Sequence, residues 1–358
     1  MTALLSPSDA QLLLAQASLA DTQGALQPEA IALIHRNGWL KMLAPAEVGG
    51  GARPLPEVVR LEEALSQTDG SCGWVTTLCA GAAWFSGFWP GDLARAILST
   101  PRLCVAGSGA PSGRAERDGS GWRISGHWRH ASGSQMATHY TFNAHLHEGG
   151  QALRDAQGQP RVCAFVVPAE QVRLVTGSWH SIGLRATTSC AFEVQQLWVP
   201  QAQAFVIDAS QAHSPGPLHR FAFDALAWVT LSACVLGMAR QFIALAEPLC
   251  ARPLPHLGGP SPTLLAAHAA HSRALANVRE RFYATLDTAW AQVCAGQTLD
   301  AAQCAQLRQQ SLALVQQARE AVDALYPGCG LQAADPRSRI NRAWRDLHTA
   351  SQHVIWQR

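Results

Sequence analysis

The chain has 358 residues, of which 48% are hydrophobic and 15% are charged, and its formal net charge is +2. This length exceeds the usual ceiling for one simple hydrophobic core, so two or three packed subdomains are expected. A nearly neutral chain without a run of Lys or Arg lacks the electrostatic footprint of a nucleic-acid-binding protein, and we exclude that class.

No uninterrupted apolar run approaches the roughly 18 residues that span a bilayer, so no membrane partner is expected. The N-terminal segment MTALLSPSDAQLLLAQ has no basic region and carries Asp9 inside its apolar pattern, which predicts a helix and not a signal peptide. The ten cysteines are scattered without a CxxC pair, so the spacing of a metal site is absent. These features predict a cytoplasmic protein with reduced, mostly buried cysteines.

The first hundred residues have the apolar spacing of helices. Apolar positions recur at intervals of three and four, and several stretches open with Ser, Asp or Pro as helix-start residues: SDAQLLLAQASLA, PEAIALIHRNGWL, PEVVRLEEALSQT and GDLARAILST. Turn-rich joins such as APAEVGGGARP separate them. Residues 1–100 are therefore predicted to form an N-terminal helical domain.

The pattern changes near Pro101. Short alternating or β-branched stretches follow, separated by Gly, Pro, Asp and Ser: RLCVAGSG, GWRISGHW, HYTFNAHL, RVCAFVVP and AFEVQQLWVP. Such stretches are typical of strands and hairpin turns, so residues 101–207 are predicted to form a middle β domain. After HSPGP (213–217), long helical patterns with short breaks predict an antiparallel four-helix bundle over 208–358.

The final predicted helix, SRINRAWRDLHTASQHVIWQR, has two contrasting arcs at about 100° per residue. One arc is apolar and should face the bundle core; it contains Ile340, Ala343, Trp344, Leu347, Ala350 and Val354. The opposite arc is polar and contains Arg342, Asp346, Thr349 and His353. One interpretation of the polar arc is a solvated face with a weak Arg342–Asp346 ion pair. The other is that this arc faces a binding pocket.

Five segments, in the same order and in matching structural zones, resemble the acyl-CoA dehydrogenase superfamily, and specifically its branch of reduced-flavin-dependent monooxygenases. They extend over nearly the whole chain: LAPAEVGG (43–50), LEEALSQTDGSCGW (61–74), GWRISGHWRHASGSQMATHY (121–140), SWHSIGLRATTSCAFEVQQLWVP (178–200) and RINRAWRDLHTASQH (339–353). The resemblance implies an α+β, acyl-CoA dehydrogenase-like fold with an N-terminal α-helical domain, a middle β-barrel-like domain and a C-terminal four-helix bundle. It also implies a homotetramer with the bundle at its centre.

In this family the flavin ring lies between the β domain and the bundle, beside the segment that matches HASGSQ. The resemblance makes Ser132 and Ser134 candidates to bond near flavin N5 or the C4 carbonyl, with Gly133 allowing close backbone approach. VAGSGAPSG (105–113) matches a second flavin-contacting loop, so Ser108 and Ser112 are weaker candidates. Taken alone, these are ordinary turn and loop serines, and the loop lacks the GxGxxG of a Rossmann site.

Two departures separate the chain from the dehydrogenases of the family. Their catalytic glutamate would fall at Val354, or near Ala227 on the first bundle helix, where Asp224 is the only nearby carboxylate. We therefore find no base for removing the α-proton of a thioester. Their Arg-x-x-Phe-Gly signature, which helps to hold the adenylyl half of FAD, is replaced by ARPLPHLGGPSP (251–262), and this favours FMN or a loosely held reduced flavin.

The monooxygenase branch keeps a histidine at the position of His353. A neutral imidazole beside the flavin can deprotonate a phenolic or amine substrate, or donate a hydrogen bond that helps a flavin hydroperoxide to persist. The resemblance therefore assigns His353 and Ser132 a catalytic role and favours a polar arc that faces the pocket. His348 lies elsewhere on the helical wheel and is expected to be a bundle or surface residue. A second pocket histidine found in some members is absent; the tryptophans of that region line a substrate cavity or are core aromatics: Trp74, Trp84 and Trp89.

The resemblance implies the oxygenase component of a two-component flavin-dependent monooxygenase. A separate reductase would supply reduced FMN, with FAD as the alternative, dioxygen would add at flavin C4a, and the hydroperoxide would oxygenate a small aromatic or heteroatom substrate. Two other functions stay open: an acyl-CoA dehydrogenase-like flavin dehydrogenase or oxidase with an unrecognised base, and a degenerate non-catalytic paralogue. The loops 147–160 and 252–262 are expected to shape the substrate cavity.

Overall fold

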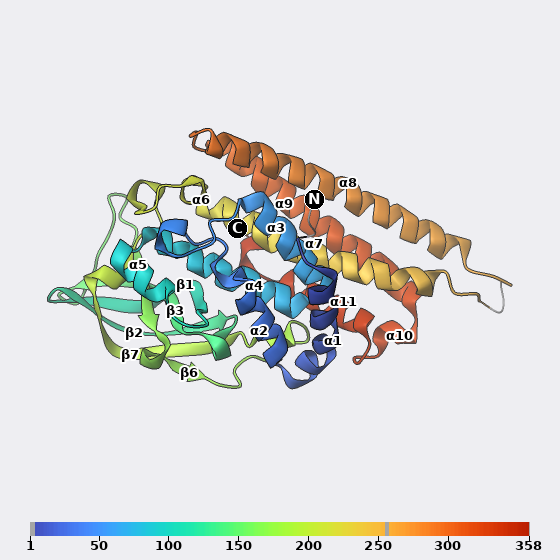
Figure 1. The fold of residues 1–358 in the computed structure, drawn as a ribbon, viewed down its shortest axis with the longest axis horizontal. Coiled ribbons are helices and arrows are strands. Elements are labelled where there is room, and N and C mark those ends of the chain that lie inside the picture. Colours follow the sequence, from blue (N-terminus) through green and yellow to red (C-terminus); the bar gives the residue numbers. More distant parts are fainter. Residues whose placement is uncertain (1–3, 255–257, 358) are drawn as a thin grey trace.

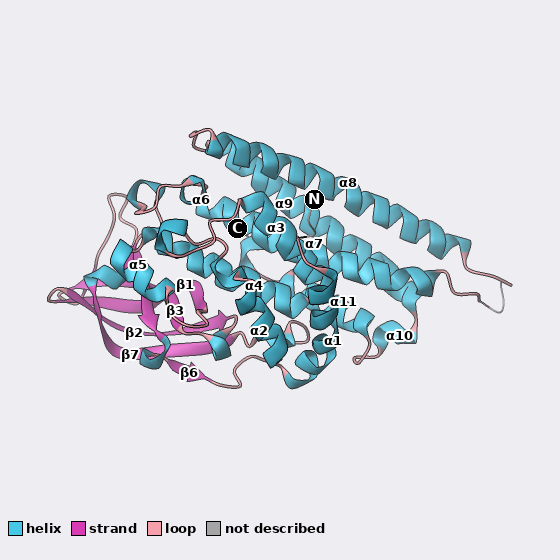
Figure 2. Cartoon of the chain, viewed as in Figure 1, coloured by secondary structure: helices cyan, strands magenta, loops and turns pink. Residues whose placement is uncertain are grey.

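The computed structural model describes residues 4–254 and 258–357. Residues 255–257, within the loop expected to shape the cavity, lie outside the described residues. Figure 1 shows a sheet at one end of the molecule and the long helices at the other, with the N-terminal helices between them. Figure 2 shows the strands gathered in that single region.

The N-terminal part is helical, with α1 (Pro7–Gln23), α2 (Pro28–Arg36), α3 (Leu55–Thr68), α4 (Gly70–Trp84) and α5 (Gly91–Leu98). Local sequence explains the start of α1, because the Ser6 hydroxyl accepts the Asp9 amide at 3.1 Å and Pro7 takes the first helical position. The turn-rich joins separate the helices as the sequence predicts.

Helix α4 is absent from the sequence prediction. Nearly all of its residues are buried, because it passes through the core of the N-terminal part. A helix that is apolar all round has no amphipathic period to detect, and its glycines and β-branched residues further weaken the local signal. Its start is nevertheless fixed locally, since the Asp69 carboxylate caps the Cys72 amide at 2.6 Å.

The middle part contains β1 (Val105–Asp118), β2 (Gly121–Ala131), β3 (His139–Glu148), β4 (Gln151–Ala152), β5 (Val162–Pro168), β6 (Arg173–Val175), β7 (Cys190–Pro200) and β8 (Ala204–Phe205). They form one sheet in the order β6-β7-β2-β1-β3-β5-β8, with β4 paired to β3. Within the described residues the order does not close on itself, so the sheet is open and not a closed barrel. Its core is aromatic and fully buried: Trp128, Phe142, Phe165 and Phe192.

The C-terminal part contains α6 (Pro217–Arg220), α7 (Phe223–Cys250), α8 (Pro262–Cys294), α9 (Ala301–Leu325), α10 (Leu331–Ala334) and α11 (Arg339–Ala350). Figure 1 shows α8 and α9 side by side along the upper edge, with α7 beneath them. Glu63 of α3 joins the N-terminal helices to this bundle, because its buried carboxylate accepts bonds from Arg240, Arg279 and Tyr283.

Helix α7 corrects the expectation about membrane-spanning segments. An 18-residue window of α7 has a mean hydropathy of 1.6. By length and composition alone, this helix could cross a bilayer. The sequence scan missed it because single Thr and Ser residues interrupt the apolar run. Within the molecule 83% of this window is buried, so its apolar surface is covered by protein, as in the core helix of a globular fold.

The last predicted helix is shorter than expected. Helix α11 ends at Ala350, and a separate short 3₁₀ segment covers Val354–Gln357. The indole of Trp356 donates to the Ala350 carbonyl at 3.1 Å, which satisfies the helix end through a tertiary contact. His353 therefore lies beyond the helix, and Val354, predicted to face the core, is 50% exposed.

Candidate functional site

The turn Ser132–Ser134, which we call the serine turn, follows β2 and is packed against α4. Gly133 adopts φ +76°, and a Cβ there would lie 2.8 Å from the Cys79 sulfur. The Cys79 thiol also lies 3.5 Å from the Ser132 carbonyl. All three turn residues are buried, so glycine at 133 is required both by the backbone conformation and by the close approach of the helix.

The segment 184–189 supplies the polar partners of the serine turn. The Ser132 hydroxyl lies 2.8 Å from that of Ser189, and the Ser189 hydroxyl lies 2.7 Å from that of Thr187. Thr187 in turn lies 2.8 Å from the Leu184 carbonyl. The Ser134 hydroxyl donates to the Thr188 carbonyl, so both serines of the turn are tied to one neighbouring segment.

The backbone around these hydroxyls is strained. Leu184 and Thr188 have φ values of +51° and +45°, and His130, just before the serine turn, has +67°. Non-glycine residues rarely occupy this region, and a β-branched threonine does so at a clear cost. Such residues cluster at functional sites, where the surrounding structure holds them in place.

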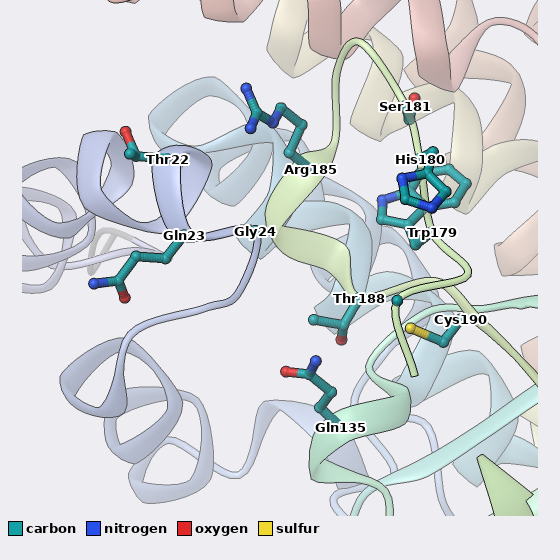
Figure 3. Close-up of a pocket in the computed structure, with 11 residues that line it drawn as sticks. Thr22, Gln23, Gly24, Gln135, Trp179, His180, Ser181, Arg185, Thr188 and Cys190 are labelled. Carbon is teal, nitrogen blue, oxygen red and sulfur yellow. The ribbon is translucent and has the colours of Figure 1, made fainter. Parts of the chain in front are cut away.

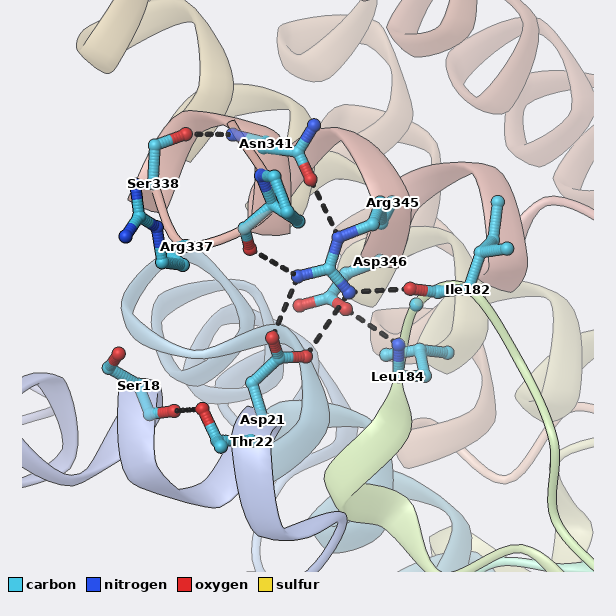
Figure 4. A network of polar contacts seen from close by, with 12 residues as sticks. Ser18, Asp21, Thr22, Ile182, Leu184, Arg337, Ser338, Asn341, Arg345 and Asp346 are labelled. Atoms are coloured by element: carbon cyan, nitrogen blue, oxygen red, sulfur yellow. Dashed lines mark hydrogen bonds and ion pairs between the residues drawn. The ribbon is translucent and has the colours of Figure 1, made fainter. Parts of the chain in front are cut away.

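Helix α11 holds the segment 182–184 in position (Figure 4). The Asp346 carboxylate accepts the Leu184 amide at 2.6 Å, and the Thr349 hydroxyl accepts the Gly183 amide at 3.1 Å. Arg345 donates to the Ile182 carbonyl and is paired with Asp21 of α1 at 2.7 Å. The polar arc thus faces protein at Asp346, and the solvated interpretation is wrong there, since Asp346 is 1% exposed.

Burial dominates the electrostatics of this anchor. It raises the pKa of Asp346 to about 7, and the nearby Asp69 carboxylate adds to the rise. The pKa of Asp69 is raised by burial as well. Arg342, 5% exposed, opposes both shifts through its positive charge. The cluster therefore favours a proton on one of its acids near neutral pH.

One face of α4 is less covered than the rest. Trp74, Leu78, Gly81 and Phe85 recur at intervals of three and four and so share one face, which we call the α4 stripe. On one flank Cys79 contacts the serine turn, and on the other Thr77 lies 3.0 Å from Cys234 of α7. The stripe therefore faces the junction between the β sheet and the bundle. Leu78, Gly81 and Phe85 are only half-buried, and a Cβ at Gly81 would meet no atom within 4 Å.

His353 lies at one end of the α4 stripe. Its ring is 5.9 Å from that of Trp74, edge to face, and its Nδ1 accepts the Ile355 amide at 3.3 Å. The imidazole is half-buried. Of the three tryptophans proposed for a cavity wall, only Trp74 reaches this place, since Trp84 and Trp89 are core residues with 1% and 0% exposure.

The other predicted residues lie apart from this cluster. Ser108 is half-buried on β1, before a register shift at 108–113, and Ser112 is exposed with its hydroxyl bonded to the His127 carbonyl at 2.8 Å. His348 lies on the bundle side of α11, 3.0 Å from Asp323 of α9. Asp224, the only carboxylate near Ala227, is exposed.

A cavity of about 390 Å³ adjoins the segment 177–190. Figure 3 shows Thr22 and Gln23 of α1 on one side of it, Trp179 and His180 on the other, and Gln135 near Thr188. Arg185 adds a guanidinium to the lining. The cavity reaches the serine turn through Gln135, the next residue along, and through Thr188, the partner of Ser134.

Sequence reasoning missed Thr187 and Ser189. Both are buried and both belong to the hydroxyl chain that ends at Ser132. The stretch RATTSC contains several hydroxyls in a row, but nothing in the sequence places it against a turn that lies 57 residues earlier. A cluster of small polar residues between two strand patterns predicts only a loop.

Residues 229–358 match the family model described as acyl-CoA dehydrogenase, C-terminal domain. The 3-HSA hydroxylase from Rhodococcus sp. RHA1 has the same fold, with a TM-score of 0.88 and 19% identity over 97% of this chain and 91% of that chain. The family match thus covers the C-terminal part of the chain, and the fold is shared over nearly the whole length. FMN-bound TdsC from Paenibacillus sp. A11-2 also shares this fold, with a TM-score of 0.80 and 20% identity over 97% and 92% of the two chains.

Two sequence relatives of the chain are oxygenases by name. The FADH(2)-dependent resorcinol hydroxylase, oxygenase component, of Rhizobium sp. (strain MTP-10005) is 26% identical over 351 residues, or 90% of this chain and 83% of the relative. The indole-3-acetate monooxygenase of Pseudomonas putida is 24% identical over 339 residues, or 94% of this chain and 85% of the relative.

The residues around the serine turn fit a flavin. An isoalloxazine ring needs hydrogen-bonding groups at its polar edge and apolar surface against its faces. The hydroxyl chain that ends at Ser132 offers the first, and the α4 stripe offers the second from the same helix that supports the turn. Both surfaces therefore adjoin α4.

Proposed function

We propose that this chain is the oxygenase component of a two-component flavin-dependent monooxygenase. It binds reduced flavin and inserts one atom of dioxygen into a small aromatic or heteroatom substrate. The observation that carries the proposal is the position of the α4 stripe, which extends from His353 past the flank that contacts the serine turn. The oxygenase names of the relatives support the same reaction class.

The residues divide the work between binding and proton transfer. Ser132, Gly133 and Ser134 hold the polar edge of the flavin, with Ser108 and Ser112 as outer contacts. When bound, reduced flavin supplies the electrons that activate dioxygen. The α4 stripe holds the substrate and excludes water, and His353 accepts the proton of a phenolic or amine substrate. The polar cavity beside Gln135 and Arg185 takes the polar part of the ligand.

The cofactor is reduced FMN, with FAD as the alternative, delivered by a separate flavin reductase. The missing Arg-x-x-Phe-Gly signature supports FMN, and the FADH(2)-dependent name of one relative supports the alternative. The oxygenase-component name of that relative supports a separate reductase. We further propose a cytoplasmic homotetramer joined through the bundle.

Among the described residues, neither position of the family's glutamate supplies a base for the dehydrogenase alternative. Val354, at the position of the family's glutamate, is 50% exposed and cannot take a proton, and Asp224 is exposed in the first turn of α7. A base for thioester chemistry must be positioned and shielded to remove an α-proton.

The decisive test uses purified protein with photoreduced FMN or FAD under anaerobic conditions, followed by ¹⁸O₂. Resorcinol, indole-3-acetate and dibenzothiophene serve as probe substrates. We expect reduced flavin to bind and ¹⁸O to enter at least one product. Bleaching of bound oxidised flavin by an acyl-CoA would instead establish a dehydrogenase. Failure to bind either redox state would establish a non-catalytic paralogue.

A further inference from the structure

We propose that Ser189 and Thr187 fix the Ser132 hydroxyl as a hydrogen-bond acceptor, and that this orientation makes the site select reduced over oxidised flavin. The inference rests on the proposed function, because it takes flavin as the ligand at the serine turn. Ser189 and Thr187 act through Ser132 and are positioning residues.

The direction of each hydrogen bond follows from counting protons. A carbonyl oxygen has no proton, so the 2.8 Å contact between Thr187 and the Leu184 carbonyl uses the single hydroxyl proton of Thr187. The 2.7 Å contact between Thr187 and Ser189 must then use the Ser189 proton. The 2.8 Å contact between Ser189 and Ser132 is left with the Ser132 proton. Ser132 therefore offers only lone pairs to a ligand.

The environment keeps this order in place. Thr187, Ser189 and Ser132 are 0%, 4% and 5% exposed, so bulk water does not compete for their protons. The Leu184 carbonyl, which is the last acceptor in this row of hydroxyls, is fixed because the amide of Leu184 is held by Asp346 at 2.6 Å. An isolated hydroxyl would rotate to suit either a donor or an acceptor, whereas this one cannot turn without breaking the chain.

The flavin changes its hydrogen-bonding character at N5 when it is reduced. Oxidised flavin presents a lone pair at N5, and reduced flavin presents an N–H. A hydroxyl oxygen that acts only as an acceptor forms a hydrogen bond with the N5–H of reduced flavin. The same oxygen repels the N5 lone pair of oxidised flavin, so specificity arises from one favourable and one unfavourable contact. The site thus retains the flavin that a reductase delivers and releases it after oxidation.

The test compares the dissociation constants of oxidised FMN and photoreduced FMN, the latter measured anaerobically. Ser189→Ala removes the acceptor of the Ser132 proton and frees that hydroxyl to donate to oxidised N5. We expect the ratio of the oxidised to the reduced dissociation constant to fall about tenfold. The midpoint potential of the bound flavin should fall by about 30 mV, the two-electron equivalent of that ratio.

Matched variants distinguish the loss of these hydroxyl hydrogen bonds from a general disturbance of the structure. Thr187→Val keeps the side-chain shape but removes the acceptor of Ser189, so it should lower the ratio in the same way. Ser189→Thr and Thr187→Ser keep the hydroxyls and should restore the wild-type ratio. Ser232→Ala removes a buried hydroxyl that lies between α7 and α9 and is not part of the hydroxyl chain, so it should leave the ratio unchanged.

The outcomes distinguish the two levels of the argument. If Ser189→Ala and Thr187→Val both keep the wild-type ratio of the oxidised to the reduced dissociation constant, the acceptor role of Ser132 is wrong. Flavin binding and the proposed function would then still stand. If the wild-type protein binds neither redox state, the proposed function fails and this inference fails with it. A low ratio in the wild type that no variant changes also overturns the acceptor role.

Discussion

The serine turn packs against α4 and the α4 stripe lies on that helix, yet the two are built in opposite ways. At the serine turn every hydroxyl proton has an acceptor, and Gly133 adopts a backbone angle that residues with a Cβ avoid and leaves room for Cys79. Along the α4 stripe there is little polar bonding, and at Gly81 there is unfilled space. A fixed polar wall suits a ligand that is always the same, and an open apolar wall suits a substrate that varies within the family.

This contrast makes different demands on the two walls. Changes at the polar wall and its supports should alter binding, stability and pH dependence. Changes at the apolar wall should alter which substrate is used. His353 contacts the stripe and is the proposed proton acceptor, so its removal should have the largest effect.

His353→Ala should lower product formation about 10³-fold, within the range seen for loss of a general base. Reduced-flavin affinity should change little, because the serine turn is untouched. The measurement is product formed per turnover together with the dissociation constant of reduced FMN. His348→Ala is the control, since it removes an imidazole that faces α9. Unchanged product formation in His353→Ala would place the base elsewhere.

Asp346→Asn should flatten the pH dependence of stability. The folded pKa of Asp346 is raised to about 7, so between pH 4 and pH 7 the folded chain binds more protons than the unfolded chain at this group. The free energy of unfolding of the wild type therefore falls across this window, by on the order of 3 kcal/mol from this group, and is level above it. Asparagine has no such proton and still accepts the Leu184 amide.

Urea unfolding at pH 4.5, 5.5, 6.5 and 7.5 measures this effect. The variant should gain on the wild type as the pH rises. Asp92→Asn is the control, because that side chain is 98% exposed. Parallel curves for Asp346→Asn and the wild type would show that the acid anchoring the segment 182–184 does not titrate in this window.

Gly133→Ala should destabilise the polar wall by about 2 kcal/mol, from its positive φ and from the new contact with Cys79. Gly119→Ala isolates the first cause, because Gly119 has φ +59° and open space around its Cβ position. The free energies of unfolding of both variants give the steric share by difference. Equal losses in the two would mean that Cys79 moves away without cost.

The order of elements could be predicted from the sequence because most helices and strands expose one face. Periodicity identifies α3 and β7 for that reason. Helix α4 gives no such signal, as it is buried on nearly every side. The end of α11 depends on Trp356, whose indole caps a carbonyl six residues earlier, and no local pattern encodes that contact.

The site was predictable only in part. A resemblance to the family pointed to Ser132 and His353, and the structure puts them on either side of α4 through Cys79 and Trp74. Their roles stay predictions. The partners of Ser132 could not be foreseen, because Thr187 and Ser189 meet it only after β7 has paired with β2 and α11 has fixed Leu184.

Gly81→Leu should change the stability of the protein least among these variants. It should nevertheless change the preference between substrates of different size. A glycine inside a helix costs up to about 1 kcal/mol relative to alanine, and a Cβ here meets nothing within 4 Å, so stability should hold or rise slightly. The leucine would fill space along the α4 stripe. We expect kcat/KM for indole-3-acetate to fall about tenfold relative to that for the smaller resorcinol, while Gly81→Ala stays near the wild-type ratio. If both substrates are affected equally, the open space at Gly81 is not where the substrate ring lies, and the α4 stripe is instead covered by another part of the assembly.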